Sequence, residues 1–207
     1  MGIVIIDYHV GNIGSIANML KKIGVKFLIT SKQNLILQAK KLILPGVGSF
    51  NNAMNKLKES DLLPVLNESV LKNKTPILGI CLGMQLFAKH SEEGQEKGLG
   101  WLDARVIRFN YPSDSKYKIP HMGWNYINLQ RENCLFDKYK SQYRFYFVHS
   151  YHLICNDNNN ILATTNYGIS FTSIVTNDNI LGVQFHPEKS HKYGMQFLKN
   201  FAEKFPC

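Results

Sequence analysis

The sequence predicts an α/β protein in which a central, largely parallel sheet is flanked by helices and the second half of the chain is rich in strands. Apolar runs in the first half, at 3–6, 42–44 and 76–80, are continuous and alternate with segments of helical periodicity. Such runs are typical of parallel strands that are buried on both faces. After Trp101 apolar and polar residues alternate along the predicted strands, and turns rich in Asn and Asp connect them, a pattern typical of half-buried strands.

The first half alternates predicted strands and helices. A strand over 2–7 leads through a turn-like segment, 8–12, into a helix in which Ile13, Ile16, Ala17, Leu20 and Ile23 recur at helical spacing. Strands follow over 25–30 and 41–44, and the second ends at Pro45-Gly46-Val47-Gly48. Helices over 51–57 and about 62–71 then lead into the strand 76–80.

In the second half we expect strands over 105–109, 144–148, 161–165 and 180–185, a polar turn at 156–160, and a closing helix over about 193–205. The chain has 207 residues, of which 44% are hydrophobic, enough for one sizeable core. It shows no linker, repeat or low-complexity tract. We therefore expect a single domain over 1–207.

Composition excludes several classes of protein. The net charge of +9 comes mostly from dispersed lysines without aromatic interleaving, which favours a solvated surface over a nucleic-acid footprint. The apolar runs are far shorter than the roughly 20 residues of a membrane span. Four scattered cysteines without a CxxC pair indicate neither a disulfide framework nor a metal site, and they fit a reducing cytoplasm.

The segment Gly79-Ile80-Cys81-Leu82-Gly83 is a candidate nucleophile site, because a buried strand delivers a cysteine between glycines and then enters a helix. This is the cysteine form of a nucleophile elbow. Such a tight turn strains its central residue, and the helix dipole favours thiolate over thiol. The structural alternative is an ordinary buried core cysteine.

A catalytic thiolate needs a base and a group that orients the base. At the end of a predicted strand, His186-Pro187-Glu188 supplies both. A lone histidine is more often structural, but this arrangement is specific, and the other six histidines lack it. We predict a triad of Cys81, His186 and Glu188, in which Glu188 holds the imidazole without accepting its proton.

With these segments the chain resembles the class I (triad) glutamine amidotransferases, whose signatures are a G-x-C-x-G-x-Q elbow and a later H-P-E. Among them it is similar to the glutaminase subunits of imidazole glycerol phosphate synthase. The resemblance covers the chain end to end, at 7–8, 11–12, 44–48, 79–86, 91–94, 98–100, 120–125, 146–151 and 184–190. The run Pro120-His121-Met122-Gly123-Trp124-Asn125 is the most discriminating.

The resemblance implies a class I glutamine amidotransferase fold and a set of site residues. Gln85 and Glu93 would contact the head group of glutamine, and the backbone of His149, Ser150 and Tyr151 would line the other side. The amide of Leu82 would stabilise the oxyanion together with the peptide at Val47 and Gly48, which must reorient first. The structural alternatives are an exposed carboxylate at Glu93, a buried strand at 149–150 and a plain glycine turn at 46–48.

The resemblance further implies a glutaminase that passes ammonia to a synthase (cyclase) subunit, a β/α barrel, in a heterodimer that makes imidazole glycerol phosphate and AICAR for histidine biosynthesis. The segment His121, Met122, Gly123, Trp124 and Asn125, together with Lys189, would face this partner; its structural alternative is a packed aromatic and a solvated lysine. No cofactor or metal is expected. The release of ammonia would be controlled if the oxyanion hole is completed only when the partner holds its acceptor substrate.

Three alternatives stay open. The first loop departs from the family pattern, with His9 where a small residue is common and Gly14 where a larger or basic one often appears. The same chemistry could therefore supply ammonia to a surface-sugar amidotransferase. A stand-alone cysteine γ-glutamyl hydrolase could share the elbow and triad and would be active alone. A noncatalytic scaffold would leave Cys81 unreactive.

Overall fold

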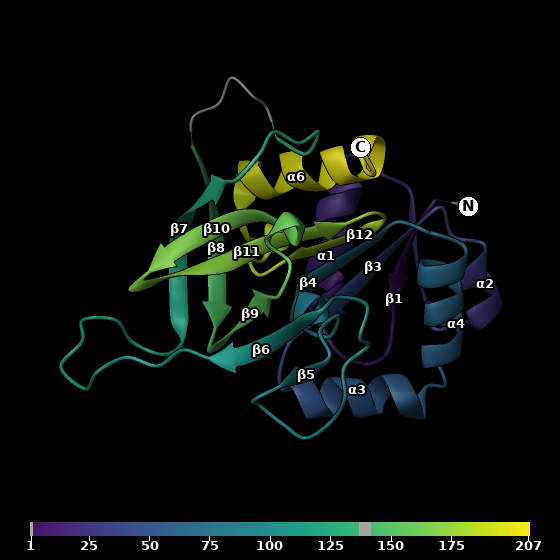
Figure 1. Ribbon diagram of the computed structural model, residues 1–207. Helices are drawn as coiled ribbons and strands as arrows, with labels where there is room; N and C mark the ends of the chain where they lie inside the picture. The colour runs from purple at the N-terminus through teal and green to yellow at the C-terminus, as the bar shows by residue number, and fades with distance from the viewer. Residues whose placement is uncertain (1, 137–141) are drawn as a thin grey trace.

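The computed structural model describes residues 2–136 and 142–207 (Figure 1). The first half carries, in order, β1 (Ile3–Ile6), α1 (Ile13–Lys22), β2 (Phe27–Thr30), α2 (Gln33–Leu37), β3 (Lys41–Gly46), α3 (Phe50–Glu59), α4 (Leu63–Asn67), a π-helical turn (Glu68–Lys72), β4 (Ile77–Cys81) and α5 (Leu82–Gln85). The second half carries β5 (His90–Ser91), β6 (Ala104–Arg108), β7 (His121–Leu129), β8 (Tyr143–His149), β9 (Tyr151–Cys155), β10 (Ile161–Tyr167), β11 (Ile169–Asn177), β12 (Ile180–Val183) and α6 (His191–Lys204).

One extended sheet runs through the molecule in the order β2-β1-β3-β4-β12-β11-β10-β7-β8, with β9, β6 and β5 branching from β11. From β2 to β12 neighbouring strands are parallel. From β12 onward β11, β10, β7 and β8 pair antiparallel. The predicted α/β class is confirmed, and the sheet is parallel where the first half of the chain builds it.

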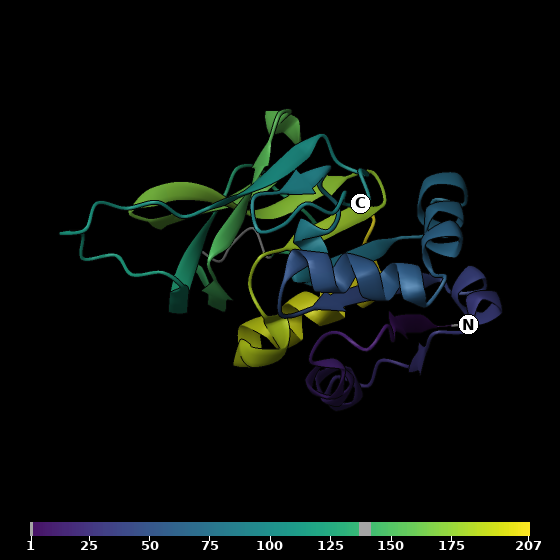
Figure 2. The same ribbon diagram turned by 90° about the horizontal axis from the view of Figure 1, so that it is seen from below.

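The helices cover both faces of the parallel part of the sheet (Figures 1 and 2). Buried side chains of α1 and α6, such as Ile16 and Phe201, pack in one cluster with Ile5 and Leu78 of the strands. Those of α2, α3 and α4 pack in a second cluster on the other face. Strands buried on both sides must be apolar at every position, which explains their continuous hydrophobic runs.

Several elements were not predicted, namely α2, β5, β7, β9 and β11. Strand β7 is the most informative, because its middle contains Gly123, Trp124 and Asn125, residues that do not give a clear apolar alternation. Burial nevertheless alternates along it, with His121 buried and Met122 and Trp124 exposed. Pairing with β8 in antiparallel register, His121 opposite His149, imposes this alternation. Tertiary pairing therefore outweighs local propensity here.

The expectation that the cysteines form no disulfide is wrong for one pair. Cys134 and Cys207 are bonded across a sequence separation of 73 residues. The pairing arises because the segment after β7 packs against α6, where Asn200 Nδ2 donates a hydrogen bond to the Leu135 carbonyl at 2.8 Å. This contact brings 134 to the C-terminal end of α6, a proximity that spacing along the chain does not reveal.

In the described part of the chain, no helix is both long enough and apolar enough to cross a membrane.

Candidate active site

Cys81 ends β4 at the centre of the parallel sheet, between β3 and β12. Its backbone has φ 55° and ψ −109°, in the region that non-glycine residues rarely adopt. Such strain persists only where the surroundings fix it. A strained residue at a strand-to-helix turn is the geometry expected of a nucleophile elbow.

The glycines beside Cys81 allow neighbouring backbone to approach. A Cβ at Gly83 would lie 2.0 Å from the Leu44 carbonyl oxygen of β3, and one at Gly79 would lie 2.6 Å from the Phe87 ring. A Cβ at Gly46 would lie 2.5 Å from the Gly83 nitrogen. The turn can therefore lie directly on the end of β3 only because these positions lack side chains.

The helix after the cysteine is short, since α5 ends at Gln85. The carbonyls of Leu86, Phe87 and Ala88 accept hydrogen bonds from Leu99, Leu102 and Gly100 instead of from a further helical turn. The macrodipole grows with the number of aligned peptides. The predicted dipole at Cys81 is therefore limited to a single turn.

His186 and Glu188 lie beside the cysteine, positioned by the chain that leaves β12. His186 Nδ1 and Glu188 Oε1 are 2.8 Å apart, and the two side chains are 3% and 1% exposed. Pro187 starts a short 3-10 turn, Pro187–Lys189, that brings the carboxylate back to the ring. The imidazole is thus held from its Nδ1 side, and its Nε2 is left for the cysteine.

The charge state of His186 follows from these neighbours. Burial by itself lowers the pKa of His186, but the negative charge and hydrogen bond of Cys81, and then those of Glu188, outweigh it and raise the pKa to about 10. A buried imidazolium is stabilised when a nearby anion and hydrogen bonds outweigh the cost of desolvation. At neutral pH the ring is therefore an imidazolium that can give a proton to a leaving group.

A cavity of about 320 Å³ opens in front of the cysteine. It is lined by Val47, Gly48, Cys81, Leu82, Gln85, Glu93, Pro120, Val148, His149, Ser150, Tyr151, His186 and Lys189. The volume lies at the small end of ligand pockets. Thus the structure brings together the predicted oxyanion and substrate-binding residues in one space, while Glu188 lies behind His186.

Glu93 lines this cavity from the loop that follows β5. Its Oε2 accepts a hydrogen bond from the Phe50 amide at 2.8 Å, at the first residue of α3. Burial raises the pKa of Glu93, and the bond from Phe50 partly opposes this shift. The side chain is therefore a half-buried carboxylate that a backbone amide anchors at the cavity wall.

Gln184 is a site residue that the sequence did not single out. It is completely buried on the segment after β12, and its Nε2 lies 3.7 Å from Cys81 Sγ. Its Oε1 accepts a hydrogen bond from Gln85 Nε2 at 3.0 Å. The sequence did carry a signal for this role, because Gln184 is a polar residue within an apolar run, two positions before His186. A buried amide requires hydrogen-bond partners, and these would lie in the site.

The predicted partner segment divides between surface and interior. Met122 and Trp124 are 61% and 42% exposed, whereas His121 is 2% exposed and contacts His149. The expectation that His121 faces the partner is therefore wrong, because alternate residues of a strand point to opposite faces. Lys189 is exposed and its Nζ lies 5.8 Å from the centre of the Tyr146 ring.

The unusual histidine of the first loop has a conformational explanation. His9 lies at φ 63°, where glycine has no steric cost. A small residue is therefore favoured at this position in the resembled family, and His9 carries some backbone strain in its place. Its amide donates to Asp7 Oδ1 at 3.1 Å, which helps to hold the loop.

Among the described residues, no group of three or more His, Cys, Asp and Glu side chains is placed to hold a metal ion. The fold and the site together are those of an α/β protein with a cysteine elbow, a buried His-Glu pair and a small polar cavity. The chain belongs to the class I glutamine amidotransferases: the family model described as glutamine amidotransferase class-I matches residues 4–205.

Two relatives resemble the chain over almost its whole length. The imidazole glycerol phosphate synthase subunit HisH 2 of Methanococcus maripaludis is 55% identical, with 98% of this chain and 99% of that protein covered. The HisH 2 subunit of Pseudomonas aeruginosa is 50% identical, with 97% and 98% covered.

Solved structures share the fold at low sequence identity. A glutamine amidotransferase from Thermotoga maritima matches with a TM-score of 0.64 and 17% identity, over 97% of this chain and 82% of that one. PurLQS from the same organism matches with a TM-score of 0.70 and 14% identity, over 96% and 95%. These likenesses establish the fold.

Proposed function

We propose that the chain is the glutaminase subunit of an imidazole glycerol phosphate synthase, acting in histidine biosynthesis. It hydrolyses glutamine to glutamate and ammonia and passes the ammonia to a synthase (cyclase) subunit that makes imidazole glycerol phosphate and AICAR. The observation that carries the proposal is that Cys81 and His186 line one cavity while Glu188 holds His186 from behind. The names of the relatives supply the pathway.

The geometry suggests the following chemistry. The Cys81 sulfur attacks the carboxamide carbon of glutamine, and the amide oxygen becomes an oxyanion beside the N–H groups of Leu82 and the Val47–Gly48 segment. His186 gives its proton to the departing nitrogen, and ammonia leaves a thioester. Water then attacks the thioester with His186 accepting the proton, which releases glutamate and restores the thiolate. The scheme uses no cofactor.

Substrate recognition would use the remaining cavity residues. Gln85, Glu93 and the backbone of His149, Ser150 and Tyr151 surround the space next to the sulfur. The half-buried carboxylate of Glu93 suits the α-ammonium group of an amino acid, since opposite charges attract more strongly where water is partly excluded. A cavity of about 320 Å³ also suits a small substrate such as an amino acid.

The proposed partner is a synthase subunit with a β/α barrel, bound as a heterodimer in the cytoplasm. Exposed Met122 and Trp124 with Lys189 would form the docking face, which is continuous with the cavity through Lys189. Aromatic residues and methionine are enriched at protein interfaces, which favours Trp124 and Met122 as the centre of this face. We propose a single domain over 1–207 as the folding unit of this subunit.

The decisive test is Cys81→Ala, assayed in the complex with glutamine and separately with ammonium salts. We expect glutamine-dependent synthesis to fall at least a thousandfold and ammonium-dependent synthesis to stay unchanged, because only the first requires the nucleophile. Loss of both activities would mean that the cysteine is structural. A Cys81 that stays intact after treatment with a glutamine-mimicking electrophile would favour the scaffold.

Partner-free turnover separates the proposal from a stand-alone γ-glutamyl hydrolase. We expect the isolated chain to hydrolyse glutamine slowly and to accelerate when the synthase subunit is loaded with its acceptor. Brisk hydrolysis by the chain alone would contradict the channelling model.

A surface-sugar amidotransferase is the second candidate partner. The observation that favours it is the first loop, where His9 and Gly14 depart from the family pattern. A pull-down with the full chain, followed by assay with the acceptor of the captured subunit, decides between the two.

A further inference from the structure

The carbonyl oxygen of Tyr151 accepts hydrogen bonds from two directions. Gln85 Nε2 donates to it at 3.1 Å from the cavity side. His149 Nδ1 lies 2.8 Å from the same oxygen. Because a carbonyl oxygen only accepts, His149 must carry its proton on Nδ1. The Nε2 of a neutral His149 is then an acceptor.

That acceptor determines the next link. His121 Nδ1 lies 3.0 Å from His149 Nε2, so His121 must donate through Nδ1 and accept through Nε2. Asn125 Nδ2 lies 3.2 Å from His121 Nε2 and supplies the hydrogen. All the bonds therefore point the same way, from Asn125 through His121 and His149 to the Tyr151 carbonyl.

The two histidines have the charge state that this direction requires. Burial lowers the pKa of His121 to about 4. Burial also dominates at His149 and lowers its pKa to about 3. Both rings are neutral at neutral pH, with one donor and one acceptor nitrogen each. Packing supports the arrangement, since His121 stacks on Phe147 with ring centres 4.9 Å apart.

From Tyr151 the hydrogen bonds continue to the nucleophile. Gln85 Nε2 has two hydrogens, and it donates one to the Tyr151 carbonyl and one to Gln184 Oε1. Gln184 Nε2 then lies 3.7 Å from Cys81 Sγ. Neither amide can rotate without losing a bond, so the nitrogen of Gln85 is committed to the protein. Its Oε1 is the atom left for a ligand in the cavity.

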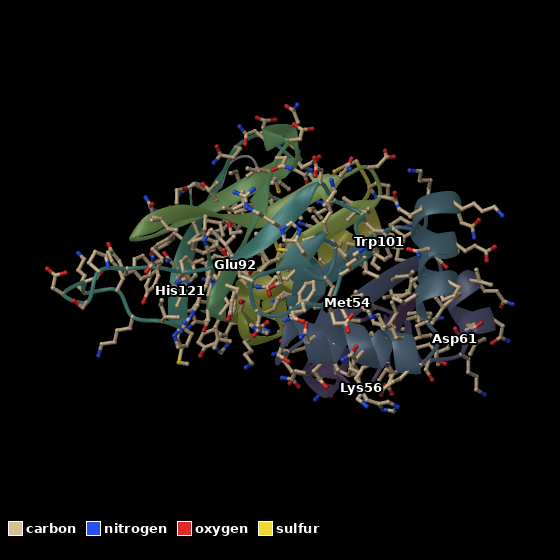
Figure 3. The ribbon with its side chains drawn as sticks, turned by 60° about the horizontal axis from the view of Figure 1, so that its bottom comes forward. Met54, Lys56, Asp61, Glu92, Trp101 and His121 are labelled. Atoms are coloured by element: carbon tan, nitrogen blue, oxygen red, sulfur yellow. A yellow bond between two sulfur atoms is a disulfide. The ribbon has the colours of Figure 1, made fainter. Side chains whose placement is uncertain are left out.

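The other end of the chain of bonds lies on the proposed docking strand. Asn125 follows exposed Trp124 in β7, and its amide also donates to the Asn166 carbonyl at 2.9 Å. Figure 3 shows His121 at the start of β7, where the connection from β6 enters the strand. The hydrogen bonds therefore run without interruption from β7, on the side of the strand opposite to Trp124, to the sulfur.

We propose that Asn125, His121 and His149 are positioning residues, which hold the Tyr151 carbonyl so that Gln85 and Gln184 keep their orientation against Cys81. We name this chain of bonds the amide–histidine relay: Asn125, His121, His149, Tyr151, Gln85, Gln184 and Cys81. The inference rests on the proposed function, because it makes the docking strand part of the support of the glutaminase site. Bond networks of this kind have effects that are not additive.

The test compares two variants with a matched control. His121→Phe and His149→Phe keep an aromatic ring in the core and remove the relay bonds. His152→Phe is the control, because His152 packs on Phe109 with ring centres 4.7 Å apart and its ring nitrogens have no hydrogen-bond partner in the described residues. In the complex we expect kcat/KM for glutamine to fall at least tenfold in both relay variants and less than twofold in the control, with ammonium-dependent synthesis unchanged in all three.

A second measurement separates positioning from a general loss of structure. His121 and Gln184 do not contact each other, so independent effects on kcat/KM would multiply in the double variant of His121→Phe and Gln184→Leu. The relay predicts instead that the double variant is no slower than the slower single variant. Multiplying effects, or relay variants that match His152→Phe, would overturn the proposal.

If the histidine variants do not fold, Asn125→Leu replaces them, because Asn125 lies at the partly exposed end of the relay. This variant should show the same loss of kcat/KM for glutamine. A wild-type kcat/KM in Asn125→Leu would overturn the relay. If the wild-type complex makes no ammonia from glutamine, the proposed function fails. In that case the relay is tested by the rate at which a glutamine-mimicking electrophile labels Cys81 in the isolated chain. We expect this labelling rate to be about fivefold lower in His121→Phe than in the wild type. Equal labelling rates in His121→Phe and His152→Phe would contradict the relay.

Discussion

Glu188 controls the proton on His186 from a site that solvent does not reach. Its Oε1 contacts the imidazole at 2.8 Å, and its Oε2 has no hydrogen-bond partner within the described residues. An unpaired carboxylate oxygen in the interior is costly. The cost is consistent with function, because a carboxylate with few other partners acts strongly on the ring beside it.

Glu188→Gln tests this electrostatic role. The variant removes an anion that helps to raise the pKa of His186 to about 10, while the opposing effect of burial remains. The pKa of His186 should therefore fall, and turnover of glutamine at neutral pH should fall by about 10²-fold or more as the proton donor is lost. NMR titration of the ring measures the shift.

Glu203→Gln, on the exposed side of α6, is the control for this titration and should leave the pKa of His186 unchanged. A Glu188→Gln protein that keeps the wild-type pKa would show that Cys81 alone sets the charge of the ring.

At the scale of elements, the elbow depends on the contact between the start of α5 and the end of β3. Gly46 of β3 pairs with Cys81 of β4, and Gly83 lies against Leu44. The oxyanion segment and the nucleophile therefore share one close backbone contact. A change that separates these two elements should disturb the site and the stability of the sheet together.

Gly83→Ala measures that contact. The added Cβ would lie 2.0 Å from the Leu44 carbonyl oxygen, and backbone on both sides must shift. We expect the free energy of unfolding to fall by about 2–3 kcal/mol, as measured by urea denaturation.

Gly14→Ala, the same chemical change at another position, should shift the free energy of unfolding in the opposite direction. Gly14 lies in α1, and a Cβ there would meet no atom within 4 Å. Alanine should raise the free energy of unfolding by about 0.5–1 kcal/mol through helix propensity. If Gly83→Ala were as mild as Gly14→Ala, the close packing of the elbow would be disproved.

On the scale of the whole molecule, the bond between Cys134 and Cys207 links the segment after β7 to the C-terminal end of α6. It closes a loop with a sequence separation of 73 residues. Cross-linking distant residues stabilises a fold mainly by restricting the unfolded chain. In a reducing cytoplasm the pair would be kept as thiols, so this contribution depends on the compartment.

Cys207→Ser should therefore lower the free energy of unfolding by about 2–4 kcal/mol without reductant and leave it nearly unchanged with reductant. Thiol titration of the denatured wild type should find two free thiols, Cys81 and Cys155, and four after reduction. Four thiols in the protein purified without reductant would show that the bond does not form.

The catalytic residues were predictable from the sequence where the groups that work together are close in the chain. Gly79, Cys81 and Gly83 are close in sequence, and so are His186 and Glu188, so a strand-to-helix turn and a strand end suffice to position each group. The α/β class was predictable for the same reason, because continuous apolar runs report burial on both faces of a sheet.

Tertiary structure alone decided what depends on contacts between distant segments. Antiparallel pairing of β7 with β8 turned His121 inward and Trp124 outward. The packing of α6 brought Cys134 to Cys207, and the junction of β4 with β12 placed Gln184 against Cys81. The local pattern of a sequence fixes which residues are apolar or flexible, but which face a strand presents and which side chains meet across a sheet depend on register and packing.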